Sequence, residues 1–302
     1  MKLKQLSVHA FYLEDQPNIG VIKEGDSAIL IDSGANEKTA GKILKALEKE
    51  GLYPLAIVNT HSHADHCGGN AFLRERTGAL VYAPRTEASI IQSPFLELFY
   101  LFSGAHPLAE LKEEMAPASE VDYIIADEEA SLTIDSLPLN IVRLPGHSPN
   151  QIGIEVDQVL FSADALFSPE LLAYYRIPFH ADIFRQKETL ARLARAPYGV
   201  YVPAHSPPGR DLAAAARLNL EVIEGVEQFL LKSLLRRKTT EEVMKELCSQ
   251  YRIEIHRVLN SYLMYTVTHA FLSSLREQGA VDVEIKDNLP CWGRVSLPGE
   301  RR

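Results

Sequence analysis

The stretch NTHSHADHCGG, residues 59–69, decides what kind of fold this chain can adopt. It places three histidines and one aspartate within six positions, as His61, His63, Asp65 and His66. Imidazole nitrogens and carboxylate oxygens are the ligands that zinc-type ions take in proteins. The stretch therefore predicts a metal site, for which the rest of the sequence has to supply the remaining ligands.

The spacing within this stretch predicts two ions. In an extended chain, residues two apart point the same way, so His61 and His63 can present both rings to one ion. Asp65 and His66 are adjacent and would diverge in an extended chain. If a helix begins just after them, both can face a second ion. The glycines at 68–69 allow the backbone to pass close by at that bend.

Four local ligands do not complete two coordination spheres. Apolar runs typical of buried strands end in three further candidates, namely His147, Asp164 and His205. Asp164 has two carboxylate oxygens and can bridge two ions. One ion would then be held by His61, His63, His147 and Asp164, and the other by Asp65, His66, His205 and Asp164. A water or hydroxide between such ions is acidified and acts as a nucleophile.

The first 210 residues alternate apolar runs with helical patterns, as α/β folds do. The runs at 27–34 and 54–60 are typical of buried strands, and residues 37–50 between them have helical spacing. Residues 84–118 interrupt this rhythm with an apolar, helical insertion. We predict a catalytic domain over residues 1–210.

After about residue 210 the sequence becomes almost wholly helical. Thr239 and Glu242 have capping-box spacing, and Gly279 is suited to end a later helix. Residues 280–295 alternate apolar and polar side chains like a small hairpin. We predict a mainly helical C-terminal domain over residues 211–302.

The ordered motifs resemble the metallo-β-lactamase fold superfamily. They are THSHADHCGG, PGHSPNQIG, FSADALF and VPAH, with LIDSG at Asp32 as the early aspartate motif. The resemblance covers roughly residues 5–208 and implies an αββα sandwich with a two-metal hydrolytic site between the sheet edges. It also implies that the seven ligands keep the roles given above, and that Asp32 holds the metal-binding loop through hydrogen bonds.

The same resemblance narrows the branch of the superfamily. Antibiotic-degrading members typically have a cysteine near the position of Asp164, whereas the glyoxalase II, lactonase and ribonuclease branches have an aspartate. The C-terminal helices and hairpin resemble the winged-helix-like tail of some hydrolases of this superfamily. Such tails accompany both thioesterase-like and ribonuclease-like cores. Because this tail is not obviously basic, we expect it to be a packing element or a homodimer contact.

These observations predict a dinuclear metal-dependent hydrolase. A hydroxide bound to both ions would attack a small thioester, ester or lactone. The resemblance implies that Asp65, besides being a ligand, would accept a proton from this nucleophile. Zinc is the first candidate for the two divalent ions, with iron or manganese as alternatives. The lysine and arginine pattern that glyoxalase II uses for glutathione is not recognisable here. Another thioester or a lactone is therefore favoured over hydroxyacylglutathione.

Two other classes of enzyme compete with this prediction. A ribonuclease or phosphodiesterase could use the same ions, but the sequence has no basic stripe and a formal net charge of −9. An iron-dependent oxygenase or redox partner could share the fold, but the intact His63 and the complete second ligand set argue against it.

Several residues near the motifs could shape a substrate pocket. Tyr174, Tyr175 and His180 follow Asp164 closely and are candidates for the pocket mouth, where a tyrosine hydroxyl could stabilise an oxyanion. Aromatic residues of the insertion could either bind an apolar acyl group or simply seat their helix on the core, and the second interpretation is favoured. These residues are Phe95, Phe99, Tyr100 and Phe102.

The composition is that of an ordinary globular protein, with 46% hydrophobic and 24% charged residues. Its three cysteines, Cys67, Cys248 and Cys291, are far apart, which suits a reducing cytoplasm. No window is apolar enough for a membrane span, and no signal peptide is recognisable at the N-terminus. We expect a cytoplasmic enzyme with a small-molecule substrate and neither a membrane nor a nucleic-acid partner.

Overall fold

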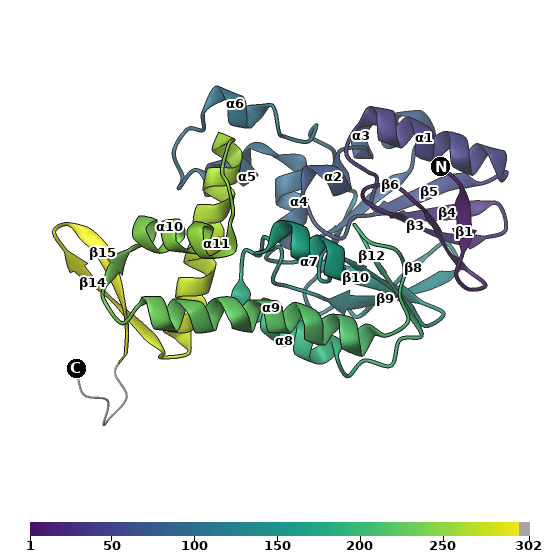
Figure 1. Cartoon of the computed structure of the whole chain (residues 1–302). Coiled ribbons are helices and arrows are strands. Elements are labelled where there is room, and N and C mark those ends of the chain that lie inside the picture. The colour runs from purple at the N-terminus through teal and green to yellow at the C-terminus, as the bar shows by residue number, and fades with distance from the viewer. Residues whose placement is uncertain (296–302) are drawn as a thin grey trace.

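A computed structural model describes residues 1–295 and has two large sheets packed face to face with helices outside them (Figure 1). The first sheet has the strand order β1-β2-β3-β4-β5-β6-β7 and is antiparallel up to β4 and parallel from there. Its strands are β1 (Leu3–Gln5), β2 (Ala10–Leu13), β3 (Ile19–Glu24), β4 (Ser27–Ile31), β5 (Tyr53–Val58), β6 (Leu80–Pro84) and β7 (Tyr123–Ile125). Helices α1 (Glu37–Lys49) and α3 (Asn70–Thr77) cover its outer face.

The second sheet has the order β12-β11-β10-β9-β8, and only its β11–β12 pair is parallel. Its strands are β8 (Ser131–Ile134), β9 (Leu137–Arg143), β10 (Ile152–Val156), β11 (Val159–Ala163) and β12 (Val200–Pro203). Helices α7 (Pro169–Tyr175), α8 (Ile183–Leu193) and α9 (Leu212–Ser233) follow these strands, and α8 and α9 pack on the outer face of this sheet. The predicted αββα sandwich is confirmed.

The continuous apolar run of β4 fits a strand that is buried on both faces. Ala28 and Leu30 face α1 and α3, whereas Ile29 and Ile31 face the second sheet. The two sheets approach each other closely at Gly20, where a Cβ atom would lie 2.7 Å from the ring of Phe161. A side chain at this position would separate the sheets.

The insertion is helical, as the sequence predicts. It consists of α4 (Arg85–Gln92), α5 (Phe95–Leu101) and α6 (Ala109–Lys112). Strands β7 and β8 were not predicted from the sequence, because both are edge strands of only three and four residues. Among the described residues, no helix is both long and apolar enough to cross a membrane.

The C-terminal segment also follows the prediction. After α9 come α10 (Thr240–Tyr251), α11 (Val258–Glu277) and a three-stranded sheet of order β13-β15-β14. Its strands are β13 (Lys238–Thr239), β14 (Val281–Lys286) and β15 (Leu289–Arg294). The capping box of Thr239 and Glu242 forms at the start of α10, and Gly279 has a φ of 71° just after α11.

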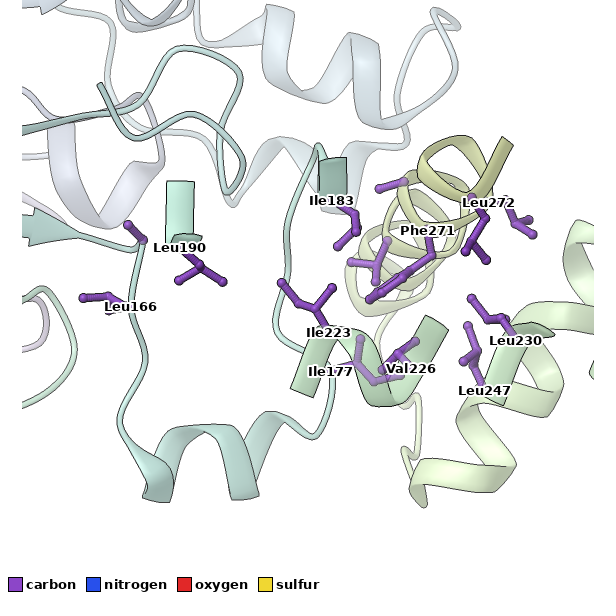
Figure 2. Packing of buried hydrophobic residues seen from close by; sticks show 14 of the residues in the cluster. Leu166, Ile177, Ile183, Leu190, Ile223, Val226, Leu230, Leu247, Phe271 and Leu272 are labelled. Carbon is purple, nitrogen blue, oxygen red and sulfur yellow. The ribbon is translucent and has the colours of Figure 1, made fainter. Parts of the chain in front are cut away.

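One hydrophobic cluster joins residues from both sides of position 210 (Figure 2). Leu166 and Leu190 belong to the first 210 residues, while Ile223, Val226 and Phe271 belong to the C-terminal segment. The C-terminal helices therefore share a core with the sandwich. The division into domains at residue 210, the winged-helix likeness and the homodimer contact stay predictions, and residues 296–302 lie outside the described part.

Candidate metal centre

The histidine-rich loop leaves the carboxyl end of β5 and turns at once into a short helix, α2 (Ala64–Cys67). A helix does begin just after these residues, as α3 at Asn70, but a short helix that the sequence did not indicate, α2, already begins at Ala64 with His63 as its N-cap. Successive helical positions are about 100° apart, so adjacent Asp65 and His66 can still face one point. Glycines follow as expected, since a Cβ atom at either position 68 or 69 would collide with a backbone oxygen.

The later candidates reach the same edge of the sandwich. Asp164 directly follows β11 and His205 lies two residues after β12. His147 is not at a strand end, because β9 ends at Arg143 and a loop carries this histidine to the site. Gly146 makes that loop possible with a φ of 142° and a close approach to Gln186.

The seven side chains converge on one cluster. The Nδ1 atom of His63 lies 3.1 Å from His61 Nε2 and 3.0 Å from His147 Nε2. His205 Nε2 lies 3.2 Å from Asp65 Oδ2 and 3.4 Å from Asp164 Oδ2. Three groups of donor atoms are each close enough to hold a cation: His61, His63 and His147; His61, His66 and Asp164; and Asp65, His66 and His205.

Asp164 occupies the middle of this arrangement. Its Oδ2 lies 3.3 Å from His147 Nε2 on one side and 3.6 Å from His66 Nε2 on the other. In the described part of the chain, Asp164 Oδ1 and His66 Nε2 are buried without any hydrogen-bond partner. Buried polar atoms are rarely left unpaired. The donors therefore fit divalent cations, and an imidazole-carboxylate set suits zinc, iron or manganese.

Burial and neighbouring groups shift the pKa values of the histidines in the cluster. Burial, together with the neighbouring His66 and His63, lowers the pKa of His61 well below its usual range. Burial likewise lowers the pKa of His147 to about 3. These two rings are thus neutral, which is the form that binds a metal ion.

The opposite side of the cluster carries excess negative charge. Burial tends to lower the pKa of His205. The carboxylate of Asp164, through its charge and its hydrogen bond, outweighs burial and raises this pKa to about 9. Burial also opposes the ionisation of Asp65, yet the charge of His66 and the hydrogen bond from His205 lower the pKa of this carboxyl. The carboxylates attract positive charge to this point, which favours cation binding there.

Asp32 fixes the loop from behind. Its carboxylate accepts hydrogen bonds from the backbone N–H and the hydroxyl of Thr60, both at 2.8 Å. His66 Nδ1 lies 2.8 Å from the same carboxylate, which directs His66 Nε2 into the cluster. Asp32 is buried and has a φ of 66°, a conformation that asparagine and aspartate adopt more readily than most residues.

Glu87 of α4 plays a similar part that the sequence did not reveal. It is fully buried and accepts hydrogen bonds from the N–H and hydroxyl of Ser62, at 3.0 and 2.6 Å. It also accepts them from the Ser148 hydroxyl and from the N–H of Asn150 at 2.9 Å. Because Ser62 and Ser148 adjoin ligand candidates, Glu87 ties two separate histidine loops together. No local motif marks it, since its partners lie 25 and 61 residues away along the chain.

A cavity of 560 Å³ opens beside the cluster. Of the three residues expected at its mouth, Tyr175 lines it. Tyr174 does not line the cavity. Neighbouring residues on a helix point about 100° apart, so the Tyr174 side chain points into solvent and is 77% exposed. His180 does not line it either, because it is buried behind His147, with ring centroids 5.9 Å apart. Burial lowers the pKa of His180 to about 3.

The aromatic residues of the insertion divide between two roles. Tyr100 lines the cavity, whereas Phe95 and Phe99 are 38% and 41% exposed and are not part of its wall. Phe102 packs on Tyr262 of α11, with ring centroids 4.8 Å apart. The sequence did not single out Glu97, which lines the cavity with Oε1 4.0 Å from His63 Nε2. Burial raises the pKa of Glu97.

Comparison with known proteins places the fold and the cluster in one class. A profile of the metallo-beta-lactamase superfamily matches residues 12–205. The chain belongs to this superfamily. It is a metal-dependent hydrolase.

The curated relatives of this chain have low sequence identity to it. The probable metallo-hydrolase YybB of Bacillus subtilis (strain 168) is 27% identical over 175 residues, which are 54% of this chain and 72% of that protein. A hydroxyacylglutathione hydrolase of Xanthomonas oryzae pv. oryzae is 31% identical over 141 residues, which are 47% of this chain but only 42% of that protein.

Two solved structures share the fold over nearly the whole chain. A metallo-beta-lactamase family protein from Thermus thermophilus has a TM-score of 0.69 at 21% identity, and the match covers 97% of this chain and 96% of that one. A Beta-lactamase domain protein from Burkholderia ambifaria has a TM-score of 0.73 at 16% identity, over 97% and 94% of the two chains. The likeness therefore extends through the C-terminal helices.

Proposed function

We propose that this protein hydrolyses a small acyl substrate, with a thioester as the first candidate and an ester or lactone as related substrates. Two divalent cations, zinc first, would be held by the seven side chains of the cluster. The observation that carries this proposal is that the cluster opens directly onto a mainly apolar cavity. The similarity to a hydroxyacylglutathione hydrolase supports an acyl substrate, although the match spans less than half of that protein.

Divalent cations at this site would supply Lewis acidity for the substrate carbonyl and acidify an attacking water. The residues of the chain do the positioning. His147 and Asp164 line the cavity and present the cluster to the carbonyl. The Asp65 side chain is 41% exposed, lines the same cavity and is ionised, so it can accept the proton of the attacking water.

The charge of the cavity favours this substrate class over RNA. Among the residues that the structure describes, no lysine or arginine lines the cavity, whereas Glu97, Glu114 and Glu254 do. Nucleic-acid binding depends on basic side chains that neutralise phosphates. Without a lysine or arginine in its lining, the cavity offers no cation for the carboxylates of glutathione, so we favour an acyl compound with an uncharged leaving group.

The test combines metal analysis of the purified protein with a substrate screen. We expect two equivalents of zinc-type metal and metal-dependent hydrolysis of neutral thioesters. Turnover should stop when a chelator removes the metal and return when zinc is added. The screen also includes lactones, phosphodiesters and RNA, with and without added salt.

Two results would contradict the proposal. One is cleavage of RNA or phosphodiesters with no turnover of any thioester, ester or lactone, together with salt-sensitive RNA binding. The other is oxygen uptake by the iron-loaded protein without hydrolysis, which would indicate an oxygenase.

A further inference from the structure

The cavity has a polar end and an apolar end that come from different parts of the chain. The polar end is the cluster described above. The apolar end is built by α5, by the loop before α11 and by α11 itself, which lie beside one another (Figure 1). Its apolar wall consists of Leu98, Leu101, Ile253, Ile255, Leu259, Leu263, Met264 and Val267.

The side chains of α11 form a regular stripe along this wall. Leu259, Leu263 and Val267 are four residues apart, so they lie one above another on one face of the helix. Eight residues of helix span about 12 Å, which is the length of the stripe. Leu259 and Leu263 are only half-buried, so the stripe is open to the cavity and is not filled by the protein core.

Contacts between the two walls hold the apolar end in shape. Phe102, just after α5, packs on Tyr262 of α11. Arg257 at the start of α11 pairs with Glu114, which follows α6 and lines the cavity. The walls are thus connected across the cavity, and a ligand would find this apolar surface largely pre-formed.

We propose that the apolar end is a subsite for the unbranched aliphatic acyl chain of the substrate, and that α11 sets the preferred chain length. This proposal rests on the proposed function, because the carbonyl must sit at the cluster for the chain to reach α11. The stripe of leucine and valine offers apolar contact area, and the polar residues beside it, Glu114, Glu254 and Asn260, include no cation that could pair with an acidic acyl group. It therefore suits a saturated chain and rejects polar or charged acyl groups.

The first experiment measures how the metal-loaded protein hydrolyses acetyl and octanoyl thioesters of N-acetylcysteamine, an uncharged thiol. We expect kcat/KM for the octanoyl thioester to exceed that for the acetyl thioester by about 100-fold, since each buried methylene contributes up to about fourfold. Leu263→Trp should fill the subsite and lower kcat/KM for the octanoyl thioester by about tenfold or more. The ratio of kcat/KM for the octanoyl thioester to kcat/KM for the acetyl thioester should therefore fall.

The matched control is Leu235→Trp. Leu235 is 70% exposed and does not line the cavity, so this variant should keep the chain-length preference. Leu263→Ala is a second variant that introduces no bulk, and it should also lower the ratio of kcat/KM for the octanoyl thioester to that for the acetyl thioester. Circular dichroism and bound-metal content show whether each variant is folded.

A binding measurement separates this proposal from the proposed function. Calorimetry with S-octyl-N-acetylcysteamine, a thioether that cannot be hydrolysed, is performed on the metal-free and metal-loaded protein. We expect binding that Leu263→Trp weakens by about tenfold and Leu235→Trp does not change. Thioether binding without hydrolysis of any thioester would support the subsite but refute the proposed function. Hydrolysis with no chain-length preference and no thioether binding would refute the subsite alone.

Discussion

The two ends of the cavity hold their side chains in different ways. At the cluster, hydrogen bonds fix the donors: Asp32 orients His66, and the Phe179 carbonyl oxygen lies 2.9 Å from His147 Nδ1. Along the apolar end, Leu259 and Leu263 have no polar side-chain atoms, and α11 places them on the cavity wall. Reaction chemistry requires fixed positions, whereas an aliphatic chain can be bound by surfaces that adjust.

This difference predicts how the two ends respond to substitution. A buried hydrogen-bonded network loses much of its function when one member is removed, because its partners are left unpaired. A packed apolar wall loses binding roughly in proportion to the area removed. Three substitutions, taken from the largest expected effect to the smallest, test this contrast.

The strongest test lies in the cluster itself. Asp65→Asn keeps the shape of the side chain but removes its charge and its capacity to accept a proton. We expect kcat to fall by about 1000-fold or more, with long and short acyl chains affected equally. Steady-state kinetics and bound-metal analysis measure this, with Asp26→Asn in an exposed turn as the control. Full activity of Asp65→Asn would refute the role of this carboxylate.

The second test targets the support of the cluster. The carboxylate of Glu87 accepts hydrogen bonds from Ser62, Ser148 and Asn150. Glu87→Gln replaces one of its acceptor oxygens with an N–H₂ group, which faces these donors and cannot accept from them. We expect metal affinity or activity to fall by about 10- to 100-fold and stability to fall by about 2 kcal/mol. Competitive metal titration and denaturant unfolding measure the two losses.

The control for this substitution is Glu75→Gln on the exposed side of α3. If Glu87→Gln lowered stability without changing metal affinity, Glu87 would serve the fold and not the site. The difference between polar and apolar ends would then be smaller than proposed.

The third test lies at the apolar end. Phe102→Ala removes the ring contact between the insertion and α11, and such pairs contribute about 1 kcal/mol beyond their buried area. We expect a small loss of stability and a several-fold weaker reaction of the octanoyl thioester, with metal binding unchanged. A double-mutant cycle with Tyr262→Ala isolates the contact. Loss of bound metal in Phe102→Ala would show that the two ends are coupled.

The seven candidate ligands were accessible to sequence analysis because each follows a strong local signal. His61 to His66 form one short motif, and Asp164 and His205 follow apolar strands whose carboxyl ends meet at one edge. Asp32 was found for the same reason. The capping box at Thr239 and the stop at Gly279 were predictable because they depend on a few neighbouring residues.

The remaining features depend on contacts between distant segments. Glu87 looks like any glutamate of a helix until the fold brings Ser62 and Ser148 to it. Tyr174 and Tyr175 are neighbours in sequence, and only the orientation of α7 decides that Tyr175 faces the cavity. The sequence did not indicate that α11 would pack against the insertion, which only the tertiary structure shows.

The sequence by itself therefore indicated the candidate donor residues, and the family resemblance that their motifs carry implied the αββα class and hydrolytic chemistry. These depend on residue type and local spacing, which short-range backbone geometry converts directly into position. Only the tertiary structure decided which carboxylate ties the histidine loops together and which helices wall the cavity. Both depend on how surfaces far apart in the chain pack together, and hydrophobic burial has no directional code that a sequence pattern could display.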